Sequence, residues 1–353
     1  YHHRKWHCQG TFSGVLKSSR KLKMKAMILA AGFGTRLKPL TNVLPKPLFP
    51  VLNRPILEHT LHFLRSHGIE KIAINLHHKP ENIINYFGDG KRFEMDLHYS
   101  REEKILGTAG GIKKLQDFFK DDSFWVINSD ILTDVDLNDV LEFHKEKKSK
   151  LTLVVRQVFN TEKYRPIKLD DDGRIVNFLG HSIMNSKHVT QVMFTGIQIV
   201  EPDIFSRIPE NKFYGTTEDV FPEMIKDGLP VYGYLHQGYW ADIGTRETYI
   251  QAQADALDGK LILKTTSSRN PEGYLAAKPV HIGKDCKISQ DSQVGPYAVL
   301  GDNCYLYPGA VVKNSILWPG TTIKNGCTVE NSIIGAGVTI NKNVKDDLLA
   351  QDY

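Results

Sequence analysis

The N-terminal two thirds of the chain alternate between short apolar runs and amphipathic segments. An aliphatic run at 26–31 ends in a glycine loop, apolar residues at 56, 57, 61 and 64 follow with helical spacing, and 72–76 forms a second run. Further strands are expected at 97–100, 124–128 and 151–157, with helices near 110–119 and 136–147. This alternation predicts an α/β domain over residues 24–258, built on a doubly wound, mostly parallel, Rossmann-like sheet.

A different period begins at residue 280. Aliphatic residues recur every six positions from 282 to 312, and two five-residue steps carry the series through 317, 323 and 329 to 334 and 340. This hexapeptide pattern predicts a left-handed parallel β-helix over 280–344, with the aliphatic residues pointing inward. Cys286 and Cys304 are one coil apart, so they are expected to stack as free thiols. Residues 259–279 are expected to form a linker and 345–353 a tail.

Length and charge limit the function classes. A chain of 353 residues suggests two domains. Residues 1–23 hold six basic residues and no acid, so the net charge of +5 leaves −1 for the rest of the chain. We therefore expect a disordered basic leader and no nucleic-acid or membrane partner. Four cysteines without a secretory signal, and no apolar run near the roughly 18 residues that span a bilayer, predict a cytoplasmic protein.

The glycine loop after the first apolar run carries the strongest chemical signal. Gly32 and Gly34 leave the backbone amides open to a polyphosphate, and Arg36 and Lys46 add positive charge. The spacing does not fit a Walker loop, and Leu37 stands where the dinucleotide fingerprint needs its third glycine. The loop therefore predicts phosphate handling of another kind.

Two aspartates follow apolar or aromatic runs farther along the chain. Asp130 ends the segment Phe-Trp-Val-Ile-Asn-Ser-Asp at 124–130, where a doubly wound sheet places its ligand site, and Asp242 precedes a glycine turn. A pair of carboxylates together with phosphate oxygens suits Mg²⁺. Asp134, Asp136 and the acidic run at 170–172 are instead expected to cap helices or form a hairpin turn.

The stretch at 28–51, with Gly-Thr-Arg-Leu at 34–37 and Pro-Lys-Pro-Leu at 45–48, resembles the signature of the sugar-1-phosphate nucleotidyltransferases. The resemblance implies that Arg36, Lys46, Asp130 and Asp242 are catalytic and that the two aspartates bind Mg²⁺. It implies nucleotide binding by a larger set, namely Leu29, Ala30, Ala31, Gly32, Gly34, Thr35, Asn75, Gly107 and Thr108. It also implies sugar binding by Thr195 and Gly196.

One feature of the family is missing. Many members carry a Glu-Lys-Pro segment whose lysine binds the sugar phosphate, whereas this chain has no such lysine at 175–184. Phosphate capture must then depend on Lys46 and on a further residue, with Lys168 and His181 as the candidates.

The resemblance leaves the substrate open. Segments at 29–32 and 237–244 look most like mannose-1-phosphate guanylyltransferases, which use GTP and mannose 1-phosphate. The central segments also resemble enzymes that use UTP or dTTP with glucose 1-phosphate or an N-acetylated sugar 1-phosphate. A non-catalytic regulatory paralogue is a third possibility, although such a protein is expected to have lost one of the four catalytic residues. The β-helix is expected to mediate assembly into a homo-oligomer.

Overall fold

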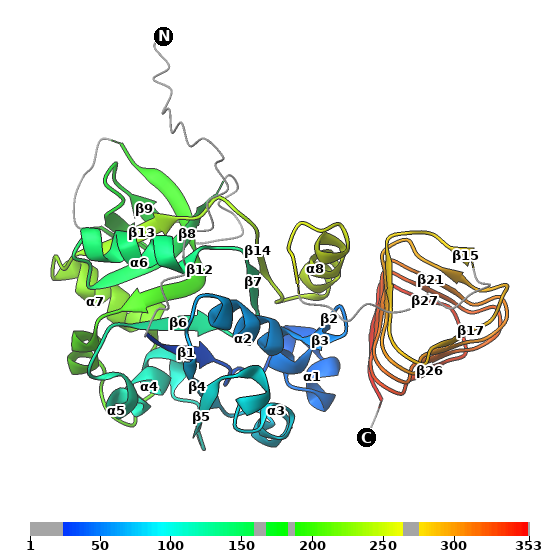
Figure 1. Ribbon diagram of the computed structural model, residues 1–353. Coiled ribbons are helices and arrows are strands. Elements are labelled where there is room, and N and C mark those ends of the chain that lie inside the picture. The colour runs from blue at the N-terminus through cyan, green and yellow to red at the C-terminus, as the bar shows by residue number, and fades with distance from the viewer. Residues whose placement is uncertain (1–23, 159–166, 183–187, 264–274, 352–353) are drawn as a thin grey trace, which may run out of the picture.

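The computed structural model describes residues 24–158, 167–182, 188–263 and 275–351 (Figure 1). Two bodies lie side by side, which we call the N-terminal unit (β1 to α8) and the β-helix (β15 to β28). The predicted leader at 1–23 lies outside the described residues. Within these ranges, no helix combines the length and the apolar character needed to cross a membrane.

One sheet of ten strands forms the centre of the N-terminal unit. Its strands are β1 (Lys25–Leu29), β4 (Lys71–Leu76), β5 (Asp96–Arg101), β6 (Phe124–Asn128), β8 (Leu151–Gln157), β9 (Ile167–Leu169), β10 (Ile175–Phe178), β11 (His181–Ser182), β12 (Thr190–Val200) and β13 (Val231–Leu235). Two small antiparallel sheets of two strands each accompany it, β2 (Pro50–Val51) with β3 (Arg54–Pro55) and β7 (Ile131–Thr133) with β14 (Trp240–Asp242).

The sheet is mixed. Strands β6, β1, β4 and β5 are parallel neighbours, which confirms the Rossmann-like prediction for the first half. Strand β12 runs antiparallel to β6, β8 and β9, so the second half departs from the mostly parallel arrangement that we expected. The reason is that, in the described part of 151–200, strands follow one another without a helix, and parallel neighbours need a long crossover.

Helices cover both faces of the sheet. They are α1 (Leu40–Val43), α2 (Ile56–Ser66), α3 (Pro80–Phe87), α4 (Gly107–Lys114), α5 (Gln116–Phe119), α6 (Leu137–Glu146), α7 (Phe221–Lys226) and α8 (Arg246–Leu257). Short 3₁₀ or π turns are η1 (Thr35–Leu37), η2 (Lys46–Leu48), η3 (Lys91–Phe93), η4 (Pro202–Arg207) and η5 (Thr216–Val220).

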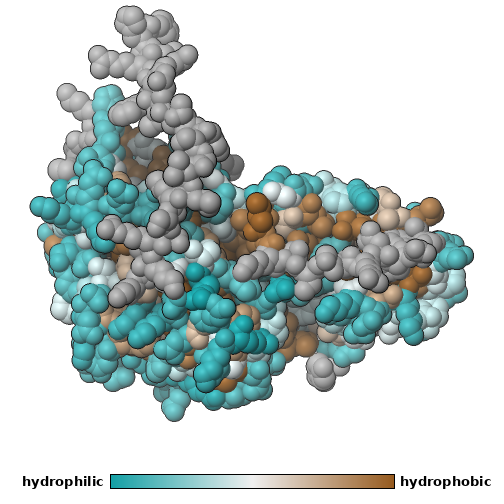
Figure 2. All heavy atoms as spheres, viewed as in Figure 1, coloured by the Kyte–Doolittle hydropathy of each residue, from teal (hydrophilic) through white to brown (hydrophobic). Residues whose placement is uncertain are grey.

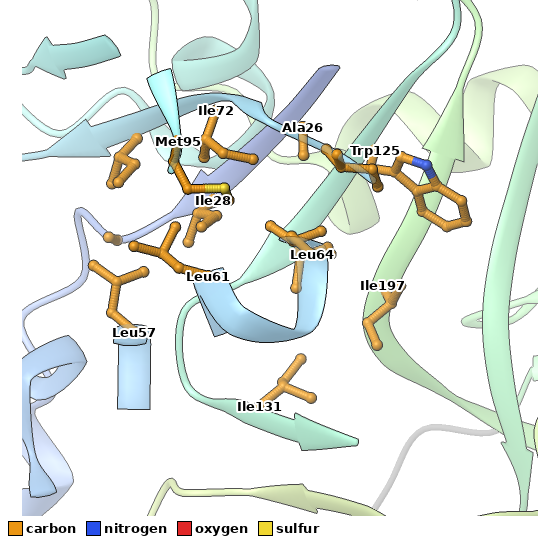
Figure 3. Close-up of a cluster of buried hydrophobic side chains, with 14 of the residues drawn as sticks. Ala26, Ile28, Leu57, Leu61, Leu64, Ile72, Met95, Trp125, Ile131 and Ile197 are labelled. Carbon is orange, nitrogen blue, oxygen red and sulfur yellow. The ribbon is translucent and has the colours of Figure 1, made fainter. Parts of the chain in front are cut away.

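Successive side chains of β1 point to opposite faces of the sheet and contribute to the hydrophobic core on each face. Ala26 and Ile28 face α2, where Leu61 and Leu64 pack against them (Figure 3), while Met27 faces the opposite cluster with α4. The expected capping role of Asp136 is confirmed, because its carboxylate accepts from the Asn138 amide at the start of α6. The helix expected near 110–119 begins earlier, at Gly107, and divides into α4 and α5.

The β-helix has three parallel sheets, and each successive coil of the chain adds a strand to them. Their strands are β15 (Leu275–Ala276), β18 (Gln293–Val294), β21 (Val311–Lys313), β24 (Thr328–Glu330) and β27 (Val344–Lys345) in the first; β16 (Val280–Ile282), β19 (Ala298–Leu300), β22 (Ile316–Leu317), β25 (Ile333–Ile334) and β28 (Leu348–Leu349) in the second; β17 (Lys287–Ile288), β20 (Tyr305–Leu306), β23 (Thr322–Ile323) and β26 (Thr339–Ile340) in the third. The inward aliphatic series is confirmed by a buried core that includes Leu300, Leu306 and Ile334.

The β-helix extends beyond the predicted range of 280–344 at both ends. Leu275 and Ala276 pair with β18 but are exposed, so the six-residue pattern of buried residues does not include them. At the other end β28 pairs with β25 across 15 residues, shorter than the preceding coils, and this breaks the period. The stacked cysteines are confirmed as free thiols: Lys287 pairs with Tyr305 directly after them.

Candidate functional site

A cleft of about 680 Å³ opens at the carboxyl ends of β1, β4 and β6, where the fold class predicted a ligand site. Most of the residues expected to bind nucleotide or to act in catalysis line it, namely Leu29, Ala30, Ala31, Gly32, Gly34, Thr35, Arg36, Lys46, Asn75, Gly107, Thr108 and Asp130. The structure therefore brings together residues from five separate places in the sequence, namely 29–36, 46, 75, 107–108 and 130.

Asn75 holds the start of the glycine loop. Its side-chain oxygen accepts from the Ala30 amide at 2.9 Å, and its amide nitrogen donates to Glu102 Oε1 at 2.8 Å. Glu102 Oε2 accepts from the Leu106 amide at 2.9 Å, so this buried carboxylate joins two loops of the cleft. A Cβ at Gly111 would lie 2.8 Å from both Asn75 and Glu102, which leaves room only for glycine. Glu102 was not predicted from the sequence, although an acidic residue between a strand and a glycine-rich helix start is a usable signal.

The glycine loop also positions Arg36. Gly34 has a left-handed backbone (φ 63°), and a Cβ there would lie 2.9 Å from Thr41 Cγ2. The chain then turns into η1, which carries Arg36. A Cβ at Gly244 would lie 2.8 Å from Arg36 Nη2 and 3.1 Å from both carboxylate oxygens of Asp242. Arg36 and Asp242 therefore approach each other across the small space that Gly244 leaves open.

Lys46 lies between the two predicted metal ligands. Its ammonium forms an ion pair with Asp130 Oδ2 and lies 3.9 Å from Asp242 Oδ1. The two aspartates are close because β14 pairs with β7 in a register that sets Asp242 opposite Ile131, and the Ile243 amide donates to the Asp130 carbonyl at 3.0 Å. Only 11% of the Lys46 side chain is exposed, so its charge is held at this point.

The two carboxylates fit a divalent ion. The side chains of Asp130 and Asp242 are 24% and 35% exposed, so neither carboxylate is fully enclosed by protein. Asp130 lines the cleft, whereas Asp242 lies beside it, within 3.9 Å of the Lys46 ammonium, and is not part of the lining. In the described part of the chain no cluster of three or more His, Cys, Asp or Glu side chains could enclose a metal. Phosphate oxygens would have to complete the coordination, which is the manner in which Mg²⁺ binds beside one or two carboxylates.

The far wall of the cleft joins α4 to the segment before η5. Thr108 Oγ1 accepts from the Thr216 amide at 2.8 Å, and the Tyr214 carbonyl accepts from the amides of Ala109 (3.0 Å) and Gly110 (3.2 Å). This contact adds Phe213 and Glu218 to the lining of the cleft. No motif in the sequence marked them, because their place depends on pairing with α4.

The residues expected to bind sugar do not line this cleft. Thr195 is 1% exposed, and its hydroxyl donates to the Val154 carbonyl at 2.7 Å. Gly196 faces Asn128, which does line the cleft, and a Cβ there would lie 2.6 Å from Asn128 Nδ2. Lys168 lies on β9 away from the lining, and the side chain of His181 is outside the described residues. The sugar-binding roles stay predictions.

A cleft with a glycine loop, Arg36, Lys46 and paired aspartates at the edge of a Rossmann-like sheet is typical of enzymes that handle nucleotide phosphates. The chain belongs to the nucleotidyl transferase family, whose model matches residues 25–259. A second model, described as the GMPPB C-terminal domain, matches residues 276–347. Enzymes of this family typically use a divalent metal ion.

Individual relatives agree with this assignment. A UTP–glucose-1-phosphate uridylyltransferase of Synechocystis sp. is 34% identical over 83% of this chain and 82% of its own length. A mannose-1-phosphate guanylyltransferase of Mycobacterium tuberculosis is 31% identical over 84% of this chain and 80% of its own. Among solved structures, HddC from Yersinia pseudotuberculosis is similar with a TM-score of 0.56 and 25% identity, over 66% of this chain and 99% of that protein.

Proposed function

We propose that the protein transfers a nucleotidyl group from a nucleoside triphosphate to a sugar 1-phosphate and releases pyrophosphate, with GTP and mannose 1-phosphate as its substrates. The observation that carries the proposal is the position of Lys46, which lines the cleft with Asp130 and whose ammonium lies against the carboxylates of both Asp130 and Asp242. The mannose-1-phosphate guanylyltransferase of M. tuberculosis and the match to the GMPPB C-terminal domain support the choice of substrates.

The chemistry needs charge neutralisation more than covalent help. An oxygen of the sugar phosphate attacks the α-phosphorus, and the bond to the departing pyrophosphate breaks. Lys46 donates hydrogen bonds to oxygens of the α-phosphate and the incoming phosphate, and Arg36 neutralises the triphosphate and the leaving pyrophosphate. Both cations are anchored near the carboxylates of Asp130 and Asp242, so they are aligned before substrate binds.

Asp130 and Asp242 would hold the metal, for which we propose Mg²⁺. When bound, the ion supplies further positive charge to the crowded phosphates. Since a lysine is held at the same carboxylates, Lys46 must turn part of its hydrogen bonding toward phosphate when substrate enters. The ion pair thus fixes the position of the Lys46 ammonium before substrate binds.

The nucleotide is proposed to lie along the glycine loop, with its base between Asn75 and the start of α4. Gly107 and Thr108 form that wall, and the amino end of a helix favours hydrogen-bond acceptors. We place the sugar beside Asn128, which lines the cleft; Gly196 lies directly behind Asn128, and Thr195, whose side chain is buried, would contribute only through this strand. In the absence of the Glu-Lys-Pro lysine, Lys46 carries the contact with the sugar phosphate.

A second substrate pair has its own support. The Synechocystis relative, at 34% identity, is named for UTP and glucose 1-phosphate. Pockets of this kind separate related sugars by only a few kcal/mol, so a small number of side chains sets the preference.

A substrate panel tests both pairs. GTP, UTP, dTTP and ATP are each incubated with mannose 1-phosphate, glucose 1-phosphate and N-acetylglucosamine 1-phosphate in the presence of Mg²⁺, and pyrophosphate is measured. We expect the largest kcat/KM for GTP with mannose 1-phosphate. A higher value for UTP with glucose 1-phosphate would replace the first pair by the second, and no release from any pair would refute nucleotidyl transfer.

We also propose that the protein is cytoplasmic and forms a homo-oligomer through the β-helix. Hydrophobic residues reach the surface near α8 and along the adjoining edge of the β-helix (Figure 2). Among the described residues, Ile262 is 95% exposed and Leu275, on the first strand of the β-helix, is 63% exposed. Light scattering of the full chain tests the assembly, and the mass of a single chain would contradict it.

A further inference from the structure

The outer face of one β-helix sheet packs against the N-terminal unit. In the sheet of β16, β19, β22, β25 and β28, Leu300, Leu317 and Ile334 point into the coil. The residues that precede them, Val299, Ile316 and Ile333, form a second column in register, which Leu348 of β28 continues. This column belongs to a hydrophobic cluster shared with the N-terminal unit. The doubled aliphatic residues at 299–300, 316–317 and 333–334 are the sequence signal for it.

Trp318 extends this contact. Its side chain is only 2% exposed, and its ring meets the ring of Phe49 edge-on, with centroids 4.8 Å apart. Phe49 is fully buried and also packs against Tyr249 of α8. Trp318 is the largest side chain in this cluster, so truncating it would remove more of the packing around Phe49 than truncating an aliphatic neighbour would.

Phe49 is linked to the candidate catalytic lysine by a backbone hydrogen bond. It follows η2, and its amide donates to the Lys46 carbonyl at 2.9 Å. Helix α8 holds the next residue, because Tyr249 Oη and Gln253 Nε2 each donate to the Pro50 carbonyl at 2.6 Å. The loop that carries Lys46 is therefore held in place by the contact of Trp318 with Phe49 and by the hydrogen bonds from α8 to Pro50.

The same cluster underlies all four candidate catalytic residues. Leu37 follows Arg36, Phe49 lies three residues after Lys46, Leu132 lies two residues after Asp130, and Ile243 follows Asp242; all four of these apolar residues belong to the cluster. The nucleotide side of the cleft rests on other cores, since Ala30 and Ala109 belong to the clusters on the two faces of the sheet. A change at Trp318 would thus move the reacting end of the cleft and leave the nucleotide end in place.

We infer that Trp318 of the β-helix is a positioning residue for catalysis, which acts through Phe49 on the loop that carries Lys46. The β-helix then supports the loop that carries Lys46, in addition to any role in assembly. The inference rests on the proposed nucleotidyl transfer. A displacement of about 1 Å at a reacting group is enough to cost about 100-fold in rate, so the effect on turnover is measurable.

The test is steady-state kinetics of the full chain with Trp318→Ala, Trp318→Phe and Trp318→Leu. For Trp318→Ala we expect kcat to fall about 10- to 100-fold, with KM for the nucleoside triphosphate within about threefold of the wild type. Trp318→Phe keeps an aromatic edge against Phe49 and should retain most of kcat. Trp318→Leu fills part of the space without that edge and should lie between Phe and Ala.

Leu306→Ala is the control for a weakened β-helix. Leu306 is fully buried inside the coil on the sheet of β20, and it is absent from the shared cluster. Its truncation should lower the thermal midpoint without lowering kcat at temperatures where the protein is folded.

Four outcomes decide the matter. A folded Trp318→Ala with wild-type kcat overturns the inference, as does a parallel loss of kcat in Leu306→Ala. If Trp318→Ala does not fold, equal and undiminished kcat in the Phe and Leu variants overturns it. A wild type that releases no pyrophosphate from any substrate pair refutes the proposed function instead, so the two failures are distinguishable.

Discussion

The N-terminal unit and the β-helix differ in how far apart in the sequence the residues lie that meet in space. In the β-helix every strand pairs with one that lies 15 to 18 residues away, so its core repeats locally along the sequence. In the N-terminal unit, Arg36, Lys46, Asp130 and Asp242 come from distant segments and meet only where loops converge at the sheet edge. Regular repetition in the sequence thus builds the β-helix, whereas the candidate active site depends on contacts between distant segments.

The two regions are nonetheless one structure at their junction. Asn53 Nδ2 donates to the Leu300 carbonyl at 2.7 Å, and Tyr297 Oη donates to Asp258 at 3.2 Å. Together with the shared hydrophobic cluster, these contacts make one face of the β-helix part of the N-terminal core. Substitutions in the candidate active site and at this junction should therefore have different effects on activity and on stability.

The largest effect is expected at the paired carboxylates. Asp130→Asn or Asp242→Asn should lower pyrophosphate release about 100- to 1000-fold, because each removes a negative charge that aligns Lys46 and holds the metal. Asp136→Asn is the matched control, since asparagine caps α6 as well as aspartate does. Normal turnover in both site variants would remove the metal assignment.

Ile316→Asp tests whether the β-helix and the N-terminal unit unfold together. Ile316 is 2% exposed in the shared cluster, and a charge without a partner there should cost about 3 to 5 kcal/mol. Scanning calorimetry should show one transition for the wild type and two for the variant. Thr339→Asp places the same charge on an exposed strand position and should change little. A single transition at the wild-type temperature in Ile316→Asp would show that the junction does not couple the two regions.

Gly244→Ala should separate activity from stability within the N-terminal unit. The new methyl group would lie 2.8 Å from Arg36 Nη2, the far end of a flexible side chain that can move aside. We expect kcat to fall about 10- to 100-fold while the thermal midpoint stays close to that of the wild type. Unchanged kinetics would mean that the position of Arg36 beside Asp242 is not needed for turnover.

The smallest effect concerns pH. Burial lowers the pKa of His59 to about 4, against an ordinary value of 6.5, and its Nε2 lies 2.9 Å from the Val51 carbonyl. Between these values the unfolded chain binds a proton that the folded protein does not, so stability is complete above pH 6.5 and falls as pH drops toward 4. The loss amounts to about 3 kcal/mol.

His59→Gln provides the check for this effect. Urea titrations at pH 7 and pH 4.5 should show a smaller difference for the variant than for the wild type. Burial also lowers the pKa of His144 and His281, and these residues remain in both proteins. Equal pH dependence in the two proteins would contradict the role of His59.

Much of the fold was predictable from sequence because local patterns specify it. The strand before the glycine loop, the cap at Asp136 and the six-residue series after residue 280 each depend on neighbours along the chain. The antiparallel half of the sheet was not predicted, since it follows from which strand β12 pairs with. The end coils of the β-helix were missed because their residues are exposed or their spacing is shorter.

For the site, the sequence determined the residue types: a glycine loop for phosphates, two cations and two carboxylates, because the chemistry demands them at strand ends. Only the tertiary structure decided that Lys46 lies between Asp130 and Asp242, that Glu102 holds Asn75, and that Thr195 is buried away from the cleft. It also decided that Trp318 packs under Phe49. The physical reason is that a residue's own segment sets its conformation, whereas its partners depend on how distant segments pack.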